Sequence, residues 1–144
     1  MSDDGRRELV TGFYENFNSN DIDAALSAFS SMLETIGPGM GTVYGHQPFR
    51  EYLEIFKRAM PDAHAVIESL FEAGETVIVE GRFVGTHTGP LASPDGDLEP
   101  TGARVDLRFA DCSRLQNGQI VSYHTYYDQL GLLTQLGLMG EAAD

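Results

Sequence analysis

The sequence predicts a single α+β domain in which helices come first and an antiparallel sheet follows. Before Pro61 the apolar residues recur at helical spacing, and after it they follow the two-residue period of strands. Two short turn signals, Ala73-Gly74 and Asn117-Gly118, divide the later part into hairpins. Because helices and strands are separated along the chain, we expect the sheet to pack one face on the helices.

Two helices are expected at the start of the chain. The first covers residues 4–17, and Asn20 or Asp21 then caps a second helix that continues to Phe29. Both have an apolar face at helical spacing, which predicts that they pack on the sheet. These faces are formed by Leu9, Val10, Phe13, Tyr14 and Phe17 and by Ile22, Ala25, Leu26 and Phe29.

A third helix follows a segment rich in glycine. Residues 37–41 (Gly-Pro-Gly-Met-Gly) are expected as a turn or loop. Pro48 suits the first turn of the helix, which ends near Met60 because Pro61 cannot extend it. Its inner side carries Phe49, Tyr52, Leu53, Phe56 and Met60.

The second half of the chain predicts strands and one short helix. A stretch rich in proline and glycine, residues 88–102, is expected as a long surface loop between the two hairpins. The chain then finishes with a short leucine-rich helix that ends at Gly137. The expected strands cover residues 63–71, 76–85, 103–115 and 119–128.

Length, composition and charge limit the possible functions. A chain of 144 residues fits one domain, which we place at residues 1–144. The sequence contains no run of eighteen apolar residues, so we expect no membrane span. The N-terminus has no apolar signal core and Cys112 is the only cysteine, so we expect a cytoplasmic protein. A formal net charge of −13 argues against nucleic acid and against anionic membranes as partners.

Four segments resemble motifs of one known family, in the family's order. Residues 59–62 (Ala-Met-Pro-Asp) are similar to the turn after its third helix, and residues 85–89 (Gly-Thr-His-Thr-Gly) to the end of one of its strands. Residues 117–121 match its usual hairpin, and residues 126–137 (Tyr-Tyr-Asp-Gln-Leu-Gly-Leu-Leu-Thr-Gln-Leu-Gly) its last strand and helix. On these motifs the chain resembles the SnoaL-like polyketide cyclases of the NTF2-like superfamily.

The resemblance implies a cone-shaped NTF2-like fold, with a curved antiparallel sheet packed on three N-terminal helices, usually as a homodimer. It also implies a pocket for a hydrophobic small molecule. Polyketide ester cyclases of this family close a ring by intramolecular aldol condensation without a metal or an organic cofactor. Their general acid/base is an aspartate late in the sheet, and Asp128 is the best matching position. Isomerase or epoxide hydrolase chemistry on the same fold is an alternative activity.

The register of the last hairpin predicts which side chains share a face. If Asn117 and Gly118 are the two turn residues, strand alternation predicts two faces for this hairpin. One face carries Arg108, Ala110, Cys112, Tyr123, Thr125 and Tyr127. A bulge would move half of these residues to the other face. The other face has an apolar wall of Val105, Leu107 and Phe109. On this face His124 pairs with Asp111, Tyr126 with Phe109 and Asp128 with Leu107.

This face suggests acid–base chemistry on a carbonyl compound. In apolar surroundings the pKa of Asp128 would rise, so that it serves as general base, with His124 assisting. A donor such as a histidine or tyrosine would stabilise the enolate oxygen. The expected ligand-binding residues are Tyr126, Leu107, Phe109, Tyr14, Phe17, Phe56 and His87.

Structural roles remain open for the same residues. Asp128 also fits an N-cap of the helix that begins at Gln129, and His124 or His87 fits a hydrogen-bonded structural histidine. The histidines are too widely spaced to predict a metal site, and Asp111 with His124 provides only two ligands. A non-catalytic ligand-binding dimer and a dimeric interaction module are therefore alternative functions.

Overall fold

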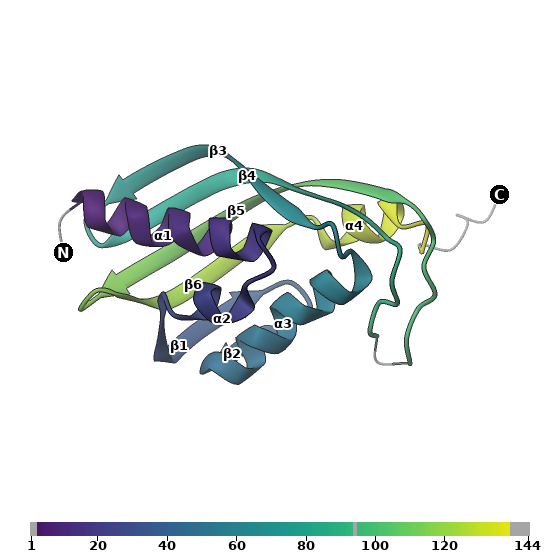
Figure 1. Cartoon of the computed structure of the whole chain (residues 1–144), viewed down its shortest axis with the longest axis horizontal. Helices are drawn as coiled ribbons and strands as arrows, with labels where there is room; N and C mark the ends of the chain where they lie inside the picture. The colour runs from purple at the N-terminus through teal and green to yellow at the C-terminus, as the bar shows by residue number, and fades with distance from the viewer. Residues whose placement is uncertain (1–2, 94, 139–144) are drawn as a thin grey trace.

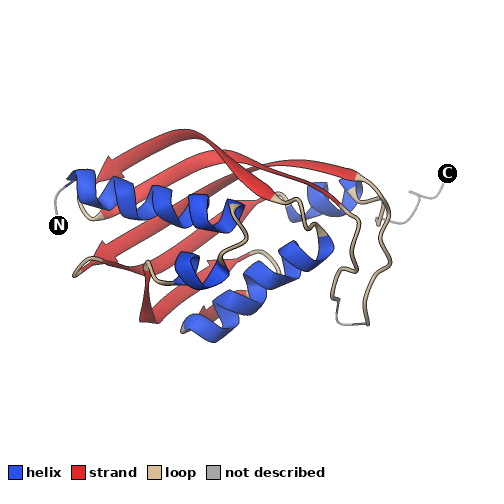
Figure 2. Ribbon diagram, viewed as in Figure 1, coloured by secondary structure: helices blue, strands red, loops and turns tan. Residues whose placement is uncertain are grey.

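The computed structural model describes residues 3–93 and 95–138, and the side chains of residues 5–93 and 95–138 (Figure 1). Residues 1, 2, 94 and 139–144 of the domain expected at 1–144 lie outside the described residues. Helices α1, α2 and α3 lie over one face of a curved six-stranded sheet, as Figure 2 shows. The expected α+β class and the three N-terminal helices are therefore confirmed.

The helices are α1 (Asp3–Asn18), α2 (Ile22–Leu26), α3 (His46–Ala59) and α4 (Gln129–Gln135). Asp21 caps α2, because its side chain accepts a 3.0 Å hydrogen bond from the backbone N–H of Ala24. This helix ends at Leu26, earlier than expected, and Phe29 already begins the first strand. No helix in the described part of the chain is long and apolar enough to cross a membrane.

The strands are β1 (Phe29–Gly37), β2 (Gly41–Tyr44), β3 (His64–Ala73), β4 (Thr76–Thr86), β5 (Arg104–Gln116) and β6 (Gln119–Tyr127). Their order across the sheet is β2-β1-β6-β5-β4-β3. The strands β1 and β2 were not expected from the sequence, and the turn expected at residues 37–41 joins them as a hairpin. Because β1 runs parallel to β6, the sheet is mixed, and the expectation of a wholly antiparallel sheet is wrong in this one pair.

A β-bulge in the β5–β6 hairpin decides which residues face the helices. Gln116 faces Gln119 and Leu115 faces Ile120, as expected, but Arg114 then faces Ser122, so Val121 is an extra residue. Beyond the bulge each residue of β6 lies on the face opposite to the one expected. The predicted pairs of His124, Tyr126 and Asp128 are therefore wrong.

Aromatic side chains form the centre of the core between the helices and the concave face of the sheet. The ring centroids of Phe13 and Phe29 are 4.9 Å apart, and those of Phe29 and Phe49 are 4.6 Å apart. Tyr123 joins this cluster at 5.1 Å from Phe49. The contacts fix α1 and α3 to the sheet, and the space between these two helices contains the pocket described next.

Candidate active site

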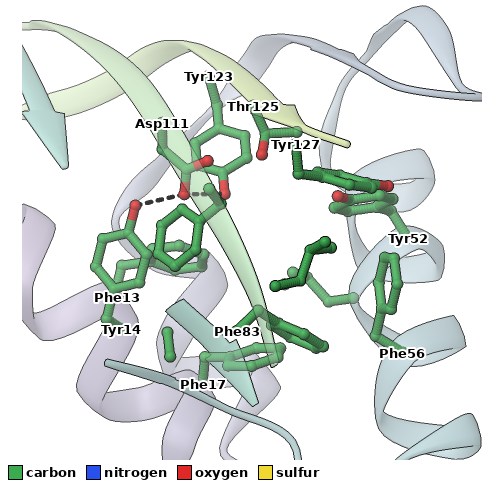
Figure 3. A pocket seen from close by; sticks show the side chains of 14 residues that line it. Phe13, Tyr14, Phe17, Tyr52, Phe56, Phe83, Asp111, Tyr123, Thr125 and Tyr127 are labelled. Carbon is green, nitrogen blue, oxygen red and sulfur yellow. Dashed lines mark hydrogen bonds between the residues drawn. The ribbon is translucent and has the colours of Figure 1, made fainter. Parts of the chain in front are cut away.

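An aromatic pocket opens between α1, α3 and the concave face of the sheet (Figure 3). Its volume is about 570 Å³, counting the open space at its mouth. Most of its wall is apolar. The lining residues are Phe13, Tyr14, Phe17, Tyr52, Leu53, Phe56, Ala65, Phe83, Leu107, Phe109, Asp111, Tyr123, Thr125 and Tyr127.

Asp111 is the only carboxylate among these lining residues. It lies on β5 and is 2% exposed. Its Oδ2 accepts a hydrogen bond of 2.6 Å from the Tyr14 hydroxyl and one of 2.7 Å from the Tyr123 hydroxyl. Its Oδ1 is buried and has no hydrogen-bond partner. One oxygen of this carboxyl group is thus fixed by the protein, and the other remains available to a ligand.

Burial raises the pKa of Asp111, because the charged carboxylate loses its hydration inside the apolar pocket. Interactions with the side chains of Thr125, Tyr14 and Tyr123 favour the ionised form and oppose this rise. Thr125 faces Asp111 across the strand pair, although no hydrogen bond of normal geometry reaches Oδ1. The result is a carboxyl group with a raised pKa that is still held in place by hydroxyl groups.

Burial also raises the pKa of Tyr14 and Tyr123 well above 10.0, and the adjacent Asp111 carboxylate adds to this rise. Both phenols therefore stay protonated and act as hydrogen-bond donors to Asp111. They come from α1 and β6, so that two different elements position the carboxyl group on β5.

A second set of polar side chains, a pair of tyrosines, lines the same pocket. Tyr52 of α3 and Tyr127 of β6 lie side by side in Figure 3, on the side away from Tyr14. The Tyr52 hydroxyl is within hydrogen-bonding reach of both Tyr127 and Thr125. Burial raises the pKa of Tyr52 and of Tyr127, so both remain neutral phenols.

Five of the expected ligand-binding residues line the pocket. Tyr14 and Phe17 come from α1, Phe56 comes from α3, and Leu107 and Phe109 come from β5. The structure brings them together on the concave face because the helical and strand periods place them there. Their contact with a ligand remains a prediction.

His124 and Tyr126 lie on the opposite face of the sheet. The bulge at Val121 turns both away from the pocket, and Tyr126 is 55% exposed. The Nε2 atom of His124 lies 2.8 Å from a carboxylate oxygen of Glu34 and 3.0 Å from the Ser122 hydroxyl. The expected single face of His124, Tyr126 and Asp128 around a ligand is therefore not formed.

Asp128 and His87 lie outside the pocket lining. Asp128 is the N-cap of α4 and accepts a hydrogen bond of 2.8 Å from the backbone N–H of Gly131, which confirms the capping interpretation. His87 is fully buried, and its Nδ1 lies 3.0 Å from the Thr101 hydroxyl. Among the described residues, no group of three histidine, cysteine or acidic side chains is arranged to hold a metal ion.

On the last hairpin, four lining residues were not expected in the site. They are Asp111 as its central group, and Tyr123, Thr125 and Tyr127, which the predicted register placed on the other face. Asp111 has a recognisable signal in the sequence. It continues the alternation of Val105, Leu107 and Phe109 on a strand whose inward positions are otherwise apolar or small. A lone acid at such a position is costly to bury, which makes it a candidate functional residue.

Comparison with known proteins identifies the family and the fold. The family model described as SnoaL-like polyketide cyclase matches residues 8–136. No curated protein matches in a sequence search. Among solved structures, a proposed SnoaL-like polyketide cyclase from Jannaschia sp. CCS1 is similar, with a TM-score of 0.84 and 18% identity, covering 98% of this chain and 98% of the other.

Two structures from Streptomyces are also similar over more than nine-tenths of this chain. AclR, a proposed hydroxylase from Streptomyces galilaeus, gives a TM-score of 0.82 at 20% identity and covers 97% of this chain and 89% of its own. IdmH, a proposed polyketide cyclase from Streptomyces antibioticus, gives 0.78 at 24% identity and covers 92% and 98%. These likenesses confirm the expected NTF2-like fold, and the family match shows that the chain belongs to the SnoaL-like polyketide cyclase family.

Proposed function

We propose that this protein is an acid–base enzyme of the cyclase or isomerase type, acting on a hydrophobic carbonyl compound, with Asp111 as its acid/base group. The observation that carries this proposal is the free Oδ1 of a buried carboxyl group in an aromatic pocket. A raised pKa brings such a group closer to the working pH, where it both accepts and returns a proton efficiently.

The hydrogen bonds decide which oxygen exchanges the proton. Oδ2 already accepts bonds from Tyr14 and Tyr123, so the proton is taken up and released at Oδ1. In a cyclisation, Oδ1 removes a proton from the carbon next to a carbonyl group and leaves an enolate. The enolate carbon bonds to a second carbonyl carbon of the same molecule, and the resulting alkoxide takes the proton back from Oδ1. No atom or electron is left over.

The same site supports isomerisation with fewer steps. The proton removed by Oδ1 returns to a different carbon of the enolate, and the double bond moves. In both reactions negative charge develops on a ligand oxygen, and a neutral tyrosine hydroxyl that lines the pocket is the donor expected to stabilise it. The apolar walls bind the carbon skeleton and exclude water from the reacting atoms.

A cytoplasmic homodimer is the assembly that we propose. The sheet face away from the helices carries large exposed side chains, three of which the strand register places together on that face. They are Tyr44 at 66%, Phe71 at 53% and Tyr126 at 55% exposure. An exposed apolar patch of this kind favours association. Light scattering of the wild type and of Tyr126→Asp tests it, because a dimer through this face should become monomeric in the variant.

Turnover and binding must be measured together to test the proposed chemistry. A panel of aromatic polyketide methyl esters and β-diketones is screened first by thermal shift, since a ligand of the folded state raises the melting temperature. Compounds that bind are then incubated with the wild type and with Asp111→Asn. Ring closure or isomerisation by the wild type alone supports the proposal. A compound that binds tightly and is recovered unchanged favours a non-catalytic binding protein instead.

A further inference from the structure

The hydroxyl groups of the pocket follow one wall rather than being scattered. On β6 the side chains of Tyr123, Thr125 and Tyr127 point to the concave face at every second position, next to Asp111 on β5. In Figure 3 Thr125 lies between Asp111 and the pair formed by Tyr52 and Tyr127. The polar wall therefore runs from the carboxyl group to this tyrosine pair.

The opposite wall contains no polar group. Phe17, Phe56 and Phe83 form it, with ring centroids 6.2 Å apart for Phe17 and Phe83 and 5.4 Å apart for Phe56 and Phe83. In Figure 3 these rings lie across the pocket from Thr125 and Tyr123. A ligand between the walls thus meets hydroxyl groups along one edge and aromatic rings along the other.

The tyrosine pair has bonding capacity left for a ligand. A phenol has one donor and accepts up to two hydrogen bonds, and Tyr127 and Thr125 lie within reach of the Tyr52 hydroxyl. Tyr127 is only partly buried, and its side chain lines the pocket. The hydrogen bonds that fix Oδ2 of Asp111 come from Tyr14 and Tyr123, and not from this pair.

We propose that the Tyr52–Tyr127 pair is a second oxygen-binding site, and that the substrate is a flat, conjugated molecule with at least two oxygen functions along one edge. One oxygen function lies next to Asp111, where the chemistry occurs, and the other binds the tyrosine pair. The pair is a specificity-determining site: it selects substrates by the spacing between their oxygens. This inference rests on the proposed function, because it takes the Asp111 end as the reacting end.

The test compares naphthalene probes with one and two hydroxyl groups. The chain contains no tryptophan, so the fluorescence of 2-naphthol and of 2,3-, 2,6- and 2,7-dihydroxynaphthalene is measured without an indole background. In the wild type, at least one diol should bind about three to ten times more tightly than 2-naphthol, as one additional hydrogen bond predicts. Tyr127→Phe and Tyr52→Phe should each reduce this gain towards one, because the diol then loses more affinity than 2-naphthol does.

Two further variants make the result specific. Tyr44→Phe, on the exposed side of the sheet, is the matched control and should keep the full gain of the diol. Asp111→Asn should change the affinity for 2-naphthol itself, because its single hydroxyl group binds at the Asp111 end. The two ends of the pocket are therefore distinguished by different variants and different probes.

Each outcome either supports the inference or overturns it. A diol gain that disappears in Tyr127→Phe or Tyr52→Phe and persists in Tyr44→Phe supports it. No gain from any diol, or a gain that persists in both pocket variants, overturns the second site but leaves Asp111-dependent turnover, measured separately, intact. Failure of all four probes to bind overturns the pocket as a ligand site, and the second site with it.

Discussion

The Tyr14 hydroxyl on α1 donates a 2.6 Å hydrogen bond to Oδ2 of Asp111 on β5, joining two residues 97 positions apart in the chain. The Tyr123 hydroxyl donates to the same oxygen at 2.7 Å. With Oδ2 occupied twice, the carboxyl group cannot rotate without losing two charge-assisted bonds. Its orientation, with Oδ1 free, is therefore a property of the folded core and does not depend on a ligand.

The first prediction concerns Asp111→Asn, which keeps the size of the side chain but cannot take up a proton. We expect the rate of the chemical step to fall by about 10²- to 10⁴-fold, as loss of a general acid/base predicts. Ligand affinity, measured with the unreactive compounds of the panel, should change much less. The measurement is single-turnover kinetics, with far-UV circular dichroism to show that the fold is retained.

Asp128→Asn is the matched control, because the sequence alone favours Asp128 as the base. Its carboxylate caps α4, so we expect a loss of stability of about 0.5–2 kcal/mol at most, with turnover per folded molecule retained. Asparagine is itself a good N-cap, which keeps the effect at the lower end. If Asp128→Asn abolished turnover while Asp111→Asn retained it, the assignment would return to Asp128.

The second prediction is a pH shift in Tyr14→Phe. The Tyr14 hydroxyl stabilises the ionised Asp111 and so lowers its pKa; its removal should raise that pKa further. The basic form of Asp111 would then appear only at higher pH. The acidic limb of the kcat/KM profile should move upwards by about one to two pH units, the equivalent of one hydrogen bond to a charged group.

Tyr126→Phe provides the comparison for this shift. Tyr126 lies on the same strand as Tyr123 but on the exposed face, so its hydroxyl has no access to the pocket. Its profile should coincide with that of the wild type. A shift of equal size in both variants would show that the profile does not report on Asp111.

The sequence was sufficient for helices α1 and α3 and for part of the concave wall. Helical spacing correctly placed Tyr14, Phe17 and Phe56, and strand alternation correctly placed Leu107 and Phe109. It was not sufficient for β6, because Val121 carries no signal that distinguishes a bulge from a regular strand residue. One extra residue exchanged the two faces, so that Thr125 and Tyr127 took the positions expected for His124 and Tyr126.

Strand β1 was missed for a related reason. Its pairing with β6 shifts between Phe29 and Glu34, so its inward residues do not alternate regularly. Only Leu33 and Thr35 are fully buried in its second half. Its parallel neighbour β6 is far away in the sequence, so no local turn signal connects them. Long-range pairing of this kind depends on the assembled sheet.

The third prediction uses the pH dependence of stability. The pKa of Asp111 is raised above 3.8 in the folded state, so between pH 3.8 and the raised value the folded protein holds more protons than the unfolded one. The free energy of unfolding contributed by Asp111 is therefore complete at low pH and is lost as the pH rises through the folded pKa. Each unit of elevation corresponds to about 1.4 kcal/mol.

The Asp111→Asn variant does not lose this contribution to the free energy of unfolding as the pH rises, because its amide does not ionise. The stability advantage of the wild type over the variant should thus decrease as the pH rises from about 4 to 8. Urea unfolding of both proteins across this range measures the difference, in which the contributions of all other groups cancel. A difference that grows with pH would mean that Asp111 has a lowered pKa in the folded state.

The last prediction concerns Gly81, which lies on β4 behind the pocket wall. A Cβ atom at this position would lie 2.1 Å from the backbone oxygen of Val66 on β3 and 3.2 Å from the ring of Phe109. The backbone contact cannot be relieved by a side-chain rotation, so Gly81→Ala must displace β3 or break its pairing with β4. We expect a loss of about 1–3 kcal/mol in the free energy of unfolding, as for overpacking in a core.

Gly12→Ala is the opposite case and serves as the control. Gly12 lies inside α1 with no atom within 4 Å of the added Cβ, so alanine should stabilise the protein by about 0.5–1 kcal/mol. Because Phe109 lines the pocket, Gly81→Ala should also weaken ligand binding, whereas Gly12→Ala should not. Equal stability of the two variants in urea unfolding would mean that β3 moves without cost, and that the edge of the sheet behind Phe109 does not hold the pocket wall in place.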